Sequence, residues 1–413
     1  MAERALHFVF LTQYYPPEPG AASLRLEAMA QELTRKGHQV SVVAAMSHHL
    51  GASSRQGRGM QVAEVVRGIP VIRTWIWRVP PNRRFWWRLL NYFSFVVTSF
   101  SGLRRLPRPD YLLIESPPLF LGITGRLYSR LFHVPYILSV SDLWPESAVA
   151  LGLVTNPLLV GLTKNLELSL YAHAGFVSTV TEGIQQAVRD TGRIAPEKVL
   201  FFPNGVDLAK FPRVAPGEAL LNRLGAHHKK VFLYPGTMGY AQGLEVVVEA
   251  AKRLKDRTDI AFLLVGEGPV KAELTRQVRE AGLDNVWFDA LQPVENMPEY
   301  FGIARGVVVP LRKHPLFKGA RPSKVFPAWS AQVPVIYVGE GEMAELILTA
   351  GGGTVVEPED GAGLAAAVVQ MADMDDVLWA AMGQAGRNFV QDHYTWQRIA
   401  EEWLKNFQPH PEG

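Results

Sequence analysis

The part of this sequence best equipped for chemistry is a basic segment that lies between two apolar runs. Residues 311–338 contain no aspartate or glutamate. Cationic side chains and helix-start N–H groups, placed beside the carboxyl ends of parallel strands, form a site for phosphate. The segment therefore predicts an anion site, although a solvated basic surface would have the same composition. Its basic residues are Arg312, Lys313, His314, Lys318, Arg321 and Lys324.

A helix is expected to begin inside this segment, at Pro322-Ser323-Lys324. Proline has the backbone angle of a first helical turn, and serine is able to cap a helix. Lys324 would add a point charge at the same place. A phosphorylated ligand is thus the predicted partner of this part of the chain.

Two carboxylates and an indole lie together in residues 141–147, directly after an apolar run. Asp142, at the carboxyl end of the expected strand, is placed to accept a proton or to hold a substrate hydroxyl. Glu146 follows Pro145 and more simply stabilises the start of the next helix. Function is therefore predicted for Asp142 and a structural role for Glu146.

Two glycine-containing turns follow apolar runs in the second half of the chain. Gly236 and Thr237 begin the first turn, and Gln242 lies where the next helix opens. Gly266 and Glu267 begin the second turn. Glycines at such turns expose N–H groups to phosphate or to base edges. One turn of this kind is commonly structural, but two of them beside a basic segment indicate a ligand site.

A third candidate is the loop of residues 14–23, which follows the first apolar run. Gly20 and Ala21 are small enough to let a ligand or a second domain approach the backbone closely. An ordinary strand-to-helix connection would have the same composition. The loop lacks the G-x-G-x-x-G spacing, which gives a nicotinamide-dependent enzyme little support.

Short apolar runs alternate with amphipathic helical patterns along the chain, as in parallel βαβ units. The expected strands of the first half are His7–Leu11, Val40–Ala44, Val71–Trp75, Tyr111–Ile114, Tyr136–Val140, Phe176–Thr179 and Lys198–Phe202. Those of the second half are Lys230–Tyr234, Ile260–Val265, Val286–Asp289, Gly306–Pro310, Val333–Val338 and Gly353–Val356. The main expected helices are Ala22–Lys36, Pro118–Phe132, Pro157–Tyr171 and Trp396–Phe407.

This order predicts an α/β protein with two successive Rossmann-like, doubly wound domains. The expected domains are residues 1–203 and 204–395, with the last helix, 396–413, packing back on the first domain. Because ligands bind at the carboxyl ends of such sheets, a cleft between the two domains is expected to hold the substrate.

Composition narrows the class of protein. The chain has 413 residues, of which 48% are hydrophobic and 20% charged, typical of a well-packed globular enzyme. Its net charge of +3 does not favour nucleic acid as a partner, and the absence of cysteine excludes disulfides and thiolate chemistry. No run of about 20 apolar residues predicts a spanning helix, and the first apolar run is too short for a secretion signal. A cytoplasmic protein is expected.

Arginines and aromatic residues interleave between residues 69 and 106. The arginines are Arg73, Arg78, Arg83, Arg84, Arg88, Arg104 and Arg105. Residues 82–103 predict an amphipathic helix suited to the headgroup layer of a membrane, which would place the protein on the inner face of the plasma membrane. Binding of single-stranded nucleic acid is a weaker alternative, and an apolar helix packed within the first domain is another.

With these residues in view, the chain resembles family 4 glycosyltransferases of the GT-B fold, from about residue 6 to residue 407. The similarity is greatest to the bacterial lipopolysaccharide and capsule branch that transfers N-acetylated amino sugars, such as the L-fucosamine transferases. The motifs that carry the resemblance are Tyr15-Pro-Pro-Glu18, Gly20-Ala-Ala22, Ser116-Pro-Pro118, Asp142-Leu-Trp-Pro-Glu-Ser147, Pro203-Asn-Gly-Val-Asp207, Ala241-Gln-Gly243, Val265-Gly-Glu-Gly268, Pro322-Ser-Lys324 and Tyr394-Thr-Trp396.

The resemblance implies a UDP-sugar donor, a lipid-linked glycan acceptor and transfer with retention of configuration. No metal and no cofactor besides the donor substrate are implied. Lys324 and the amides of Ser323 and Lys324 would hold the diphosphate, with help from Arg312. Gly20 would leave room for the diphosphate, and Asp142 would bind the donor sugar or an acceptor hydroxyl. Gly266 and Glu267 would lie beside the uracil or the ribose.

Two departures from the family keep an alternative open. The family's paired glutamates, eight positions apart, fall on Gly319 and Pro327 in this sequence. Proline cannot bind the ribose hydroxyls, so a catalytically silent relative that serves as a binding partner in polysaccharide assembly is the second hypothesis. A UDP-sugar epimerase is a third, which leaves the aromatic helix unexplained. The sequence does not identify the donor sugar, the acceptor, the linkage or the oligomeric state.

Overall fold

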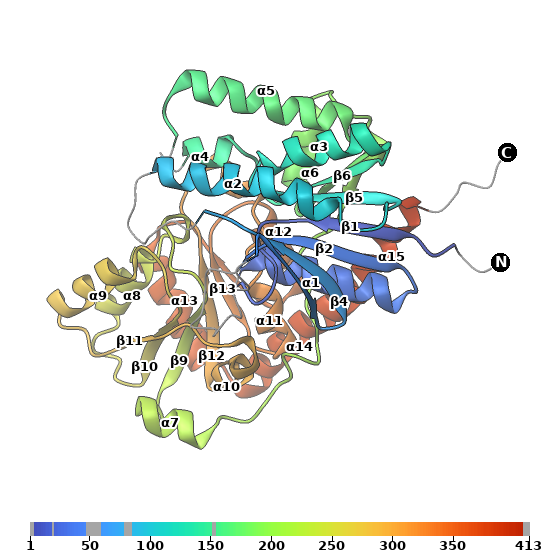
Figure 1. Cartoon of the computed structure of the whole chain (residues 1–413). Helices are drawn as coiled ribbons and strands as arrows, with labels where there is room; N and C mark the ends of the chain where they lie inside the picture. The colour runs from blue at the N-terminus through green and yellow to red at the C-terminus, as the bar shows by residue number, and fades with distance from the viewer. Residues whose placement is uncertain (1–3, 19, 47–58, 78–84, 151–153, 408–413) are drawn as a thin grey trace. The chain divides into compact units, whose positions relative to one another are not determined.

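The computed structural model describes residues 4–18, 20–46, 59–77, 85–150 and 154–407. Internal contacts divide the chain into two compact units. Unit 1 comprises Met1–Asn204 together with Trp396–Gly413, and unit 2 comprises Gly205–Thr395. Each unit is a sheet with helices packed on it (Figure 1).

The sheet of unit 1 has eight strands in the order β3-β4-β2-β1-β5-β6-β7-β8. All described neighbours are parallel except β3 and β4, which form an antiparallel hairpin. The strands are β1 (His7–Leu11), β2 (Gln39–Ala45), β3 (Gln61–Val66), β4 (Ile69–Thr74), β5 (Tyr111–Ser116), β6 (Tyr136–Val140), β7 (Phe176–Thr179) and β8 (Val199–Phe201). The helices are α1 (Ala21–Arg35), α2 (Phe85–Leu103), α3 (Leu121–Phe132), α4 (Glu146–Ala150), α5 (Pro157–His173), α6 (Glu182–Asp190) and α15 (Trp396–Leu404).

Strand β3 was not expected from the sequence. It is an edge strand whose side chains are mostly exposed or half-buried, so it lacks the apolar run that marks a buried strand. Arg67 and Gly68 both have positive φ, which fits the tight turn that joins β3 to β4. The expected strands on either side of this hairpin are confirmed within a few residues.

Unit 2 has a six-stranded parallel sheet in the order β11-β10-β9-β12-β13-β14. The strands are β9 (Lys230–Pro235), β10 (Ile260–Val265), β11 (Val286–Asp289), β12 (Ala304–Pro310), β13 (Val335–Val338) and β14 (Gly353–Val356). The helices are α7 (Glu218–Leu224), α8 (Glu245–Arg253), α9 (Lys271–Glu280), α10 (Met297–Gly302), α11 (Val325–Ser330), α12 (Glu342–Ala350), α13 (Gly361–Asp373) and α14 (Asp376–His393).

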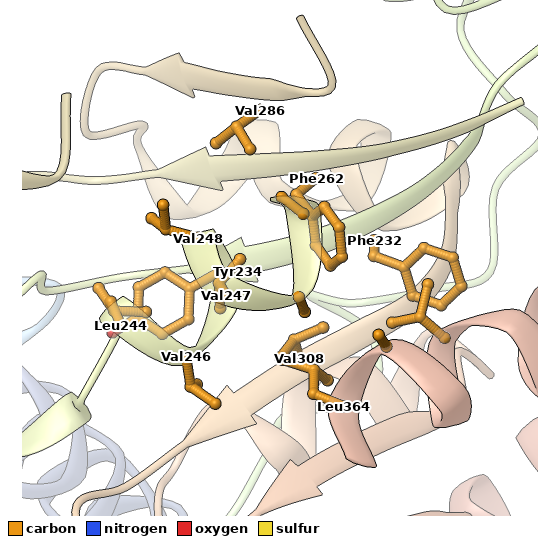
Figure 2. Close-up of a cluster of buried hydrophobic side chains, with 14 of the residues drawn as sticks. Phe232, Tyr234, Leu244, Val246, Val247, Val248, Phe262, Val286, Val308 and Leu364 are labelled. Atoms are coloured by element: carbon orange, nitrogen blue, oxygen red, sulfur yellow. The ribbon is translucent and has the colours of Figure 1, made fainter. Parts of the chain in front are cut away.

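The core of unit 2 lies between this sheet and the helices α8 and α13 (Figure 2). Phe262 and Val308 from the strands meet Leu244 and Val247 from the start of α8 and Leu364 from α13. Burial of such apolar side chains fixes the strands, and with them the loops at their carboxyl ends.

The C-terminal helix α15 belongs to the core of unit 1. Trp403 is fully buried, contacts the ring of Phe8 on β1, and donates a hydrogen bond from Nε1 to Ser178 Oγ at 3.2 Å. Lys36, after α1, forms an ion pair with Glu401 at 2.8 Å. The last helix therefore packs on the sheet of unit 1, although its sequence follows unit 2.

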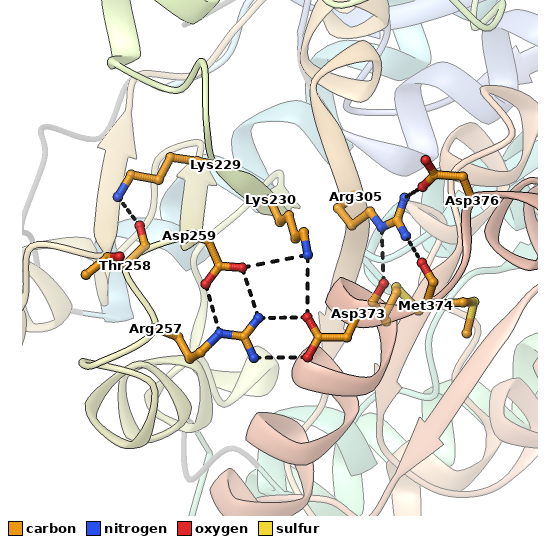
Figure 3. Close-up of polar contacts among 10 residues, drawn as sticks. Lys229, Lys230, Arg257, Thr258, Asp259, Arg305, Asp373, Met374 and Asp376 are labelled. Carbon is orange, nitrogen blue, oxygen red and sulfur yellow. Dashed lines mark hydrogen bonds and ion pairs between the residues drawn. The ribbon is translucent and has the colours of Figure 1, made fainter.

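A polar network joins the start of β9 and β10 to the end of α13 (Figure 3). Arg257 forms ion pairs with Asp259 and Asp373, both at 2.8 Å, and Lys230 lies 3.4 Å from Asp373. These groups are partly exposed, so screening keeps their contribution to stability small. The network lies at the amino ends of the strands, whereas the candidate site lies at their carboxyl ends.

Candidate active site

The basic segment forms the connection between β12 and β13, as the sequence predicts. It contains a short 3-10 helix, Pro315–Gly319, and then α11. Lys324 is the N-cap of α11, so the expected helix start is confirmed within one residue. No side chain caps this helix, which means that the expected capping role of the Ser323 hydroxyl is not observed.

Lys324 is held over the end of strand β9. Its Nζ donates a hydrogen bond to the hydroxyl of Tyr234 at 2.7 Å and lies 3.9 Å from the centre of the same ring. The Tyr234 hydroxyl donates in turn to the carbonyl of Thr237 at 2.5 Å. A Cβ atom on Gly236 would lie 3.7 Å from Lys324 Nζ. The fold thus brings together Lys324, Gly236 and Thr237, which the sequence predicted as separate parts of one site.

The charge of Lys324 has no carboxylate partner among the residues that the structure describes. The residue is half-buried, and removal of the ammonium group from water lowers the pKa of Lys324 to about 7. A bound diphosphate would supply the missing negative charge and raise this pKa again. Lys324 is therefore poised to bind an anion at neutral pH.

Because of this lowered pKa, the affinity for a diphosphate ligand, tested with UDP, is expected to fall as the pH rises above about 7. The bound diphosphate favours protonated Lys324, so above that pH binding must take up a proton, with a loss of up to about tenfold per pH unit. Below that pH, the lysine is charged before and after binding and has no further effect. Calorimetric titration in buffers of different ionisation enthalpy measures both the affinity and the proton uptake.

The variant Lys324→Arg is the control for this pH dependence, because arginine stays charged and the titration of UDP itself is common to both proteins. The ratio of the two affinities should change with pH. A ratio that stays constant above neutral pH would contradict the assignment.

Arg312 holds the loop between β9 and α8. Its guanidinium forms an ion pair with Glu245 at 2.7 Å and donates to the carbonyl of Tyr240 at 2.7 Å. Its backbone N–H donates to the carbonyl of Ala241 at 2.9 Å. Both charged groups are about 42% exposed, so the pair is accessible to solvent. The position beside the glycine turn suits a ligand contact, and a catalytic role for Arg312 stays a prediction.

Gln242 closes the turn in which it lies. Its Oε1 accepts a hydrogen bond from the Gly239 N–H at 3.0 Å. The side chain therefore shapes the loop that begins at Gly236, and a direct contact between Gln242 and substrate stays a prediction.

The two predicted glycine turns pack backbone against backbone. A Cβ atom on Gly266 would lie 1.9 Å from the Gly236 carbonyl oxygen, and one on Gly268 would lie 2.2 Å from that of Met238. The glycines at 266 and 268 are thus required by the close approach of the two turns. Glu267 forms an ion pair with Lys271 at 2.6 Å.

Lys271 is a residue of this region that the sequence analysis missed. Its Nζ also donates to the carbonyls of Gly266 at 2.9 Å and Asp289 at 3.2 Å. The side chain thereby ties together the carboxyl ends of β10 and β11. A lysine in the first turn of a helix gives no sequence signal for this role.

Two cations of the basic segment have structural roles. Arg321 is buried, forms an ion pair with Glu342, and donates to the Tyr394 hydroxyl at 2.9 Å. Lys318 forms an ion pair with Glu340 at 3.1 Å. The predicted anion site is therefore narrower than the basic segment and centres on Lys324.

In unit 1, Asp142 is the second residue after β6, and the residue is exposed. Partial removal of its carboxyl from water raises the pKa of Asp142 to about 6, against the opposing effect of a hydrogen bond with Ser147. The carboxylate is thus largely ionised at neutral pH and can accept a hydrogen bond. Glu146 is the first residue of α4, which confirms its predicted structural place.

Gly20 and Ala21 form the start of α1, also in unit 1. Gly20 is the N-cap with φ of 141°, no side chain caps the helix, and a Cβ at this position would meet nothing within 4 Å. The helix start is therefore open on the side of Gly20. Close approach of a ligand here stays a prediction.

No group of three or more His, Cys, Asp or Glu side chains that could hold a metal ion occurs within residues 4–18, 20–46, 59–77, 85–150 and 154–407. Over the same ranges, no helix is long and apolar enough to cross a membrane.

Arg73 is the first of the arginines that interleave with aromatic residues between residues 69 and 106. Arg73 is buried, where it donates to the carbonyls of Tyr15 and Ala45 at 3.2 Å and pairs with Glu64 at 2.8 Å. Arg73 therefore has a structural role in unit 1, and it lies outside the 82–103 helix that was expected at the membrane surface. Arg78, Arg83 and Arg84 lie outside the described residues, as does the side chain of Arg88.

Comparison with known proteins decides the class of enzyme. Residues 20–205 match the family described as "Glycosyl transferase 4-like domain", and residues 229–374 match "Glycosyl transferases group 1". The chain is 31% identical over 296 residues to the putative colanic acid biosynthesis glycosyl transferase WcaI of Escherichia coli K12, covering 69% of this chain and 71% of WcaI. The chain belongs to the glycosyltransferases. The predicted enzyme class is confirmed.

A more distant relative is the probable glycosyltransferase WbjE of Pseudomonas aeruginosa. It is 22% identical over 312 residues, which cover 74% of this glycosyltransferase and 76% of WbjE.

Solved structures confirm the GT-B fold. HepE of Anabaena, in complex with UDP and glucose, aligns with a TM-score of 0.74 at 16% identity, covering 97% of this chain and 99% of HepE. WaaG, a glycosyltransferase of lipopolysaccharide biosynthesis, aligns with a TM-score of 0.69 at 16% identity, covering 95% of this chain and 97% of WaaG. The two parallel-sheet units are the two Rossmann-like domains of that fold.

Proposed function

We propose that this glycosyltransferase moves a sugar from a UDP-sugar to a lipid-linked glycan in the synthesis of a cell-surface polysaccharide. The observation that carries the proposal is the half-buried Lys324, which is aimed at the Gly236 turn and has no carboxylate partner among the described residues. An ammonium group in this setting fits the diphosphate of a nucleotide sugar.

Three kinds of relative support the finer parts of this proposal. HepE binds UDP and glucose, which favours a UDP donor. WcaI is named for colanic acid biosynthesis and WaaG for lipopolysaccharide biosynthesis, which favours a glycan acceptor. The motifs shared with amino-sugar transferases favour an N-acetylated amino sugar, transferred with retention.

The proposed chemistry uses the charged groups of Lys324 and Asp142. As the sugar leaves the diphosphate, negative charge grows on the leaving oxygen, and protonated Lys324 would stabilise it. The Asp142 carboxylate, ionised above about pH 6, would accept a hydrogen bond from a hydroxyl of the donor sugar or the acceptor. The acceptor oxygen bonds to the anomeric carbon while the bond from that carbon to the diphosphate oxygen breaks, and the proton of the acceptor hydroxyl passes to the departing UDP.

Calorimetric titration of the protein with UDP, with ADP and GDP as controls, tests the donor. Binding that is selective for UDP supports the proposal, and release of UDP from a UDP-sugar in the presence of acceptor lipid completes it. If no nucleotide binds, the proposed donor is wrong.

The alternative of a silent binding partner rests on Gly319 and Pro327. Gly319 ends the 3-10 helix, and Pro327 lies within α11. Because one residue is a glycine and the other a proline, neither position supplies a carboxylate. A protein that binds UDP but never releases it from a UDP-sugar would favour this second function.

We also propose that α2 and α3 rest on an anionic membrane surface. The two helices pack together, and each has a row of exposed apolar side chains at helical spacing. These are Leu90, Phe93 and Val97 on α2, and Ile123, Leu127 and Leu131 on α3. Neither helix contains an acidic residue. Apolar rows of this kind mark an interaction site, and the exposed arginines Arg104, Arg105 and Arg130 near the helix ends favour anionic lipid headgroups.

Removing these charges is expected to weaken binding to vesicles of phosphatidylglycerol and phosphatidylcholine. Each arginine contributes about 1 kcal/mol, so the triple variant Arg104→Gln, Arg105→Gln, Arg130→Gln should bind at least about tenfold more weakly. Co-sedimentation with the vesicles measures the change.

An apolar variant and a matched control separate the two contributions. Leu127→Gln should weaken binding to the same vesicles, whereas Leu348→Gln should not, because Leu348 is an exposed leucine of unit 2. Equal vesicle binding by all variants would contradict the membrane contact.

A further inference from the structure

The loop that carries Asp142 begins beside a buried ion pair. Arg25 on α1 and Glu115 on β5 are 3% and 1% exposed, and Arg25 Nη2 lies 2.5 Å from Glu115 Oε1. Arg25 is on the same face of α1 as Ala21, one turn earlier. The pair therefore connects the start of α1 to the carboxyl end of the sheet.

Ser141, the residue before Asp142, joins this pair. Its hydroxyl donates to Glu115 Oε1 and accepts from Arg25 Nη2. Its backbone N–H donates to the carbonyl of Ser116 at 2.9 Å. Both the main chain and the side chain of Ser141 are thus fixed where the loop leaves β6.

The other end of the loop is held from α5. Lys164 contacts the carboxylate of Glu146 and forms an ion pair with Glu167 at 2.5 Å. Glu167 is 2% exposed and accepts a hydrogen bond from the Tyr171 hydroxyl at 2.7 Å. Within the loop, the Ser147 N–H donates to the Leu143 carbonyl at 2.9 Å.

Buried ion pairs add little net stability, because the cost of removing two charges from water offsets their attraction. They do favour one arrangement of the groups that they join, since any other arrangement leaves a charge unpaired. Here the buried pair joins the start of α1 to the ends of β5 and β6, where the loop begins. The contact between Lys164 and Glu146 at the other end of the loop is partly exposed, so it holds that end more weakly.

We propose that Arg25, Glu115 and Ser141 at one end of the loop and Lys164 at the other are positioning residues that hold the Asp142 carboxylate for the transfer reaction. This inference rests on the proposed function, because it takes Asp142 to contact the donor sugar or the acceptor. None of the four residues needs to touch substrate.

Ser141→Ala is the main test, because it removes one hydroxyl and leaves the buried charges in place. The variant is expected to lower kcat for release of UDP from UDP-N-acetylglucosamine at least about tenfold, with KM within about twofold. Ser141→Thr keeps the hydroxyl and should restore most of kcat. Ser139→Ala, a buried serine two residues earlier on β6, is the matched control and should behave as the wild type.

Hydrogen–deuterium exchange of the full chain without ligand provides a readout that needs no turnover. Ser141→Ala should speed exchange of the amides of residues 141–147 at least about tenfold, and Ser139→Ala should not. Lys164→Met should speed exchange at the Glu146 end of the same loop.

The outcomes separate this inference from the proposed donor. UDP binding that is unchanged in Ser141→Ala, together with a lower kcat, supports positioning of Asp142. If Ser141→Ala and Ser139→Ala give the same kcat and the same exchange, the inference is overturned. A wild-type chain that binds no UDP overturns the proposed donor, and the exchange experiment still decides whether the loop is held in this way.

Discussion

Lys324→Ala is expected to weaken UDP binding about 10- to 100-fold, because a charge-assisted hydrogen bond to a phosphate contributes about 1.5–3 kcal/mol. Turnover should fall by a further factor of about 100, since the charge on the leaving diphosphate is greatest in the transition state. Calorimetry measures the first effect, and release of UDP from a UDP-sugar measures the second.

Lys318→Ala is the matched control for this substitution. Lys318 lies in the same basic segment, but its ammonium is paired with Glu340 and its side chain is 56% exposed. The control should bind UDP as the wild type does. Equal UDP affinity in Lys324→Ala and Lys318→Ala would show that Lys324 does not bind the diphosphate.

Gly266→Ala is expected to destabilise unit 2 by about 3 kcal/mol or more, since it combines a strained backbone with overpacking against main-chain atoms. Gly266 has φ of 152°, and an added Cβ would lie 1.9 Å from the carbonyl oxygen of Gly236. The obstacle is backbone, so a side-chain rotation cannot relieve it. Differential scanning calorimetry would record the loss as a lower unfolding temperature.

Gly225→Ala separates the two causes of this loss. Gly225 also has a positive φ, of 62°, but a Cβ there would meet nothing within 4 Å. The substitution Gly225→Ala should lower the free energy of unfolding only by the backbone strain, about 1–2 kcal/mol. If Gly266→Ala were no worse than Gly225→Ala, the two turns would not pack as closely as the structure shows.

The sequence by itself determined most of the fold and the position of Lys324. Buried parallel strands are continuous apolar runs, so β1, β6, β7 and β10 could be predicted residue for residue. The short edge strands β11 and β14, which are mostly half-buried, were also predicted with their observed bounds. The loops at the carboxyl ends of these strands were then expected to carry the polar residues of the site. This expectation identified Asp142, the two glycine turns and the start of α11 as candidates. Edge strand β3 was missed because Gln61 and Glu64 interrupt its apolar residues and none of its side chains is buried.

Only the tertiary structure decided which polar groups meet. Lys324 binds Tyr234, 90 residues earlier, and Arg312 pairs with Glu245, 67 residues earlier. Arg321 and Lys324 are three residues apart in one basic segment, yet Arg321 is buried against Glu342 while Lys324 has no carboxylate partner among the described residues. Local patterns report burial and turns, which depend on neighbouring residues. The partner of a charge depends on how distant segments pack, and no spacing along the chain encodes it.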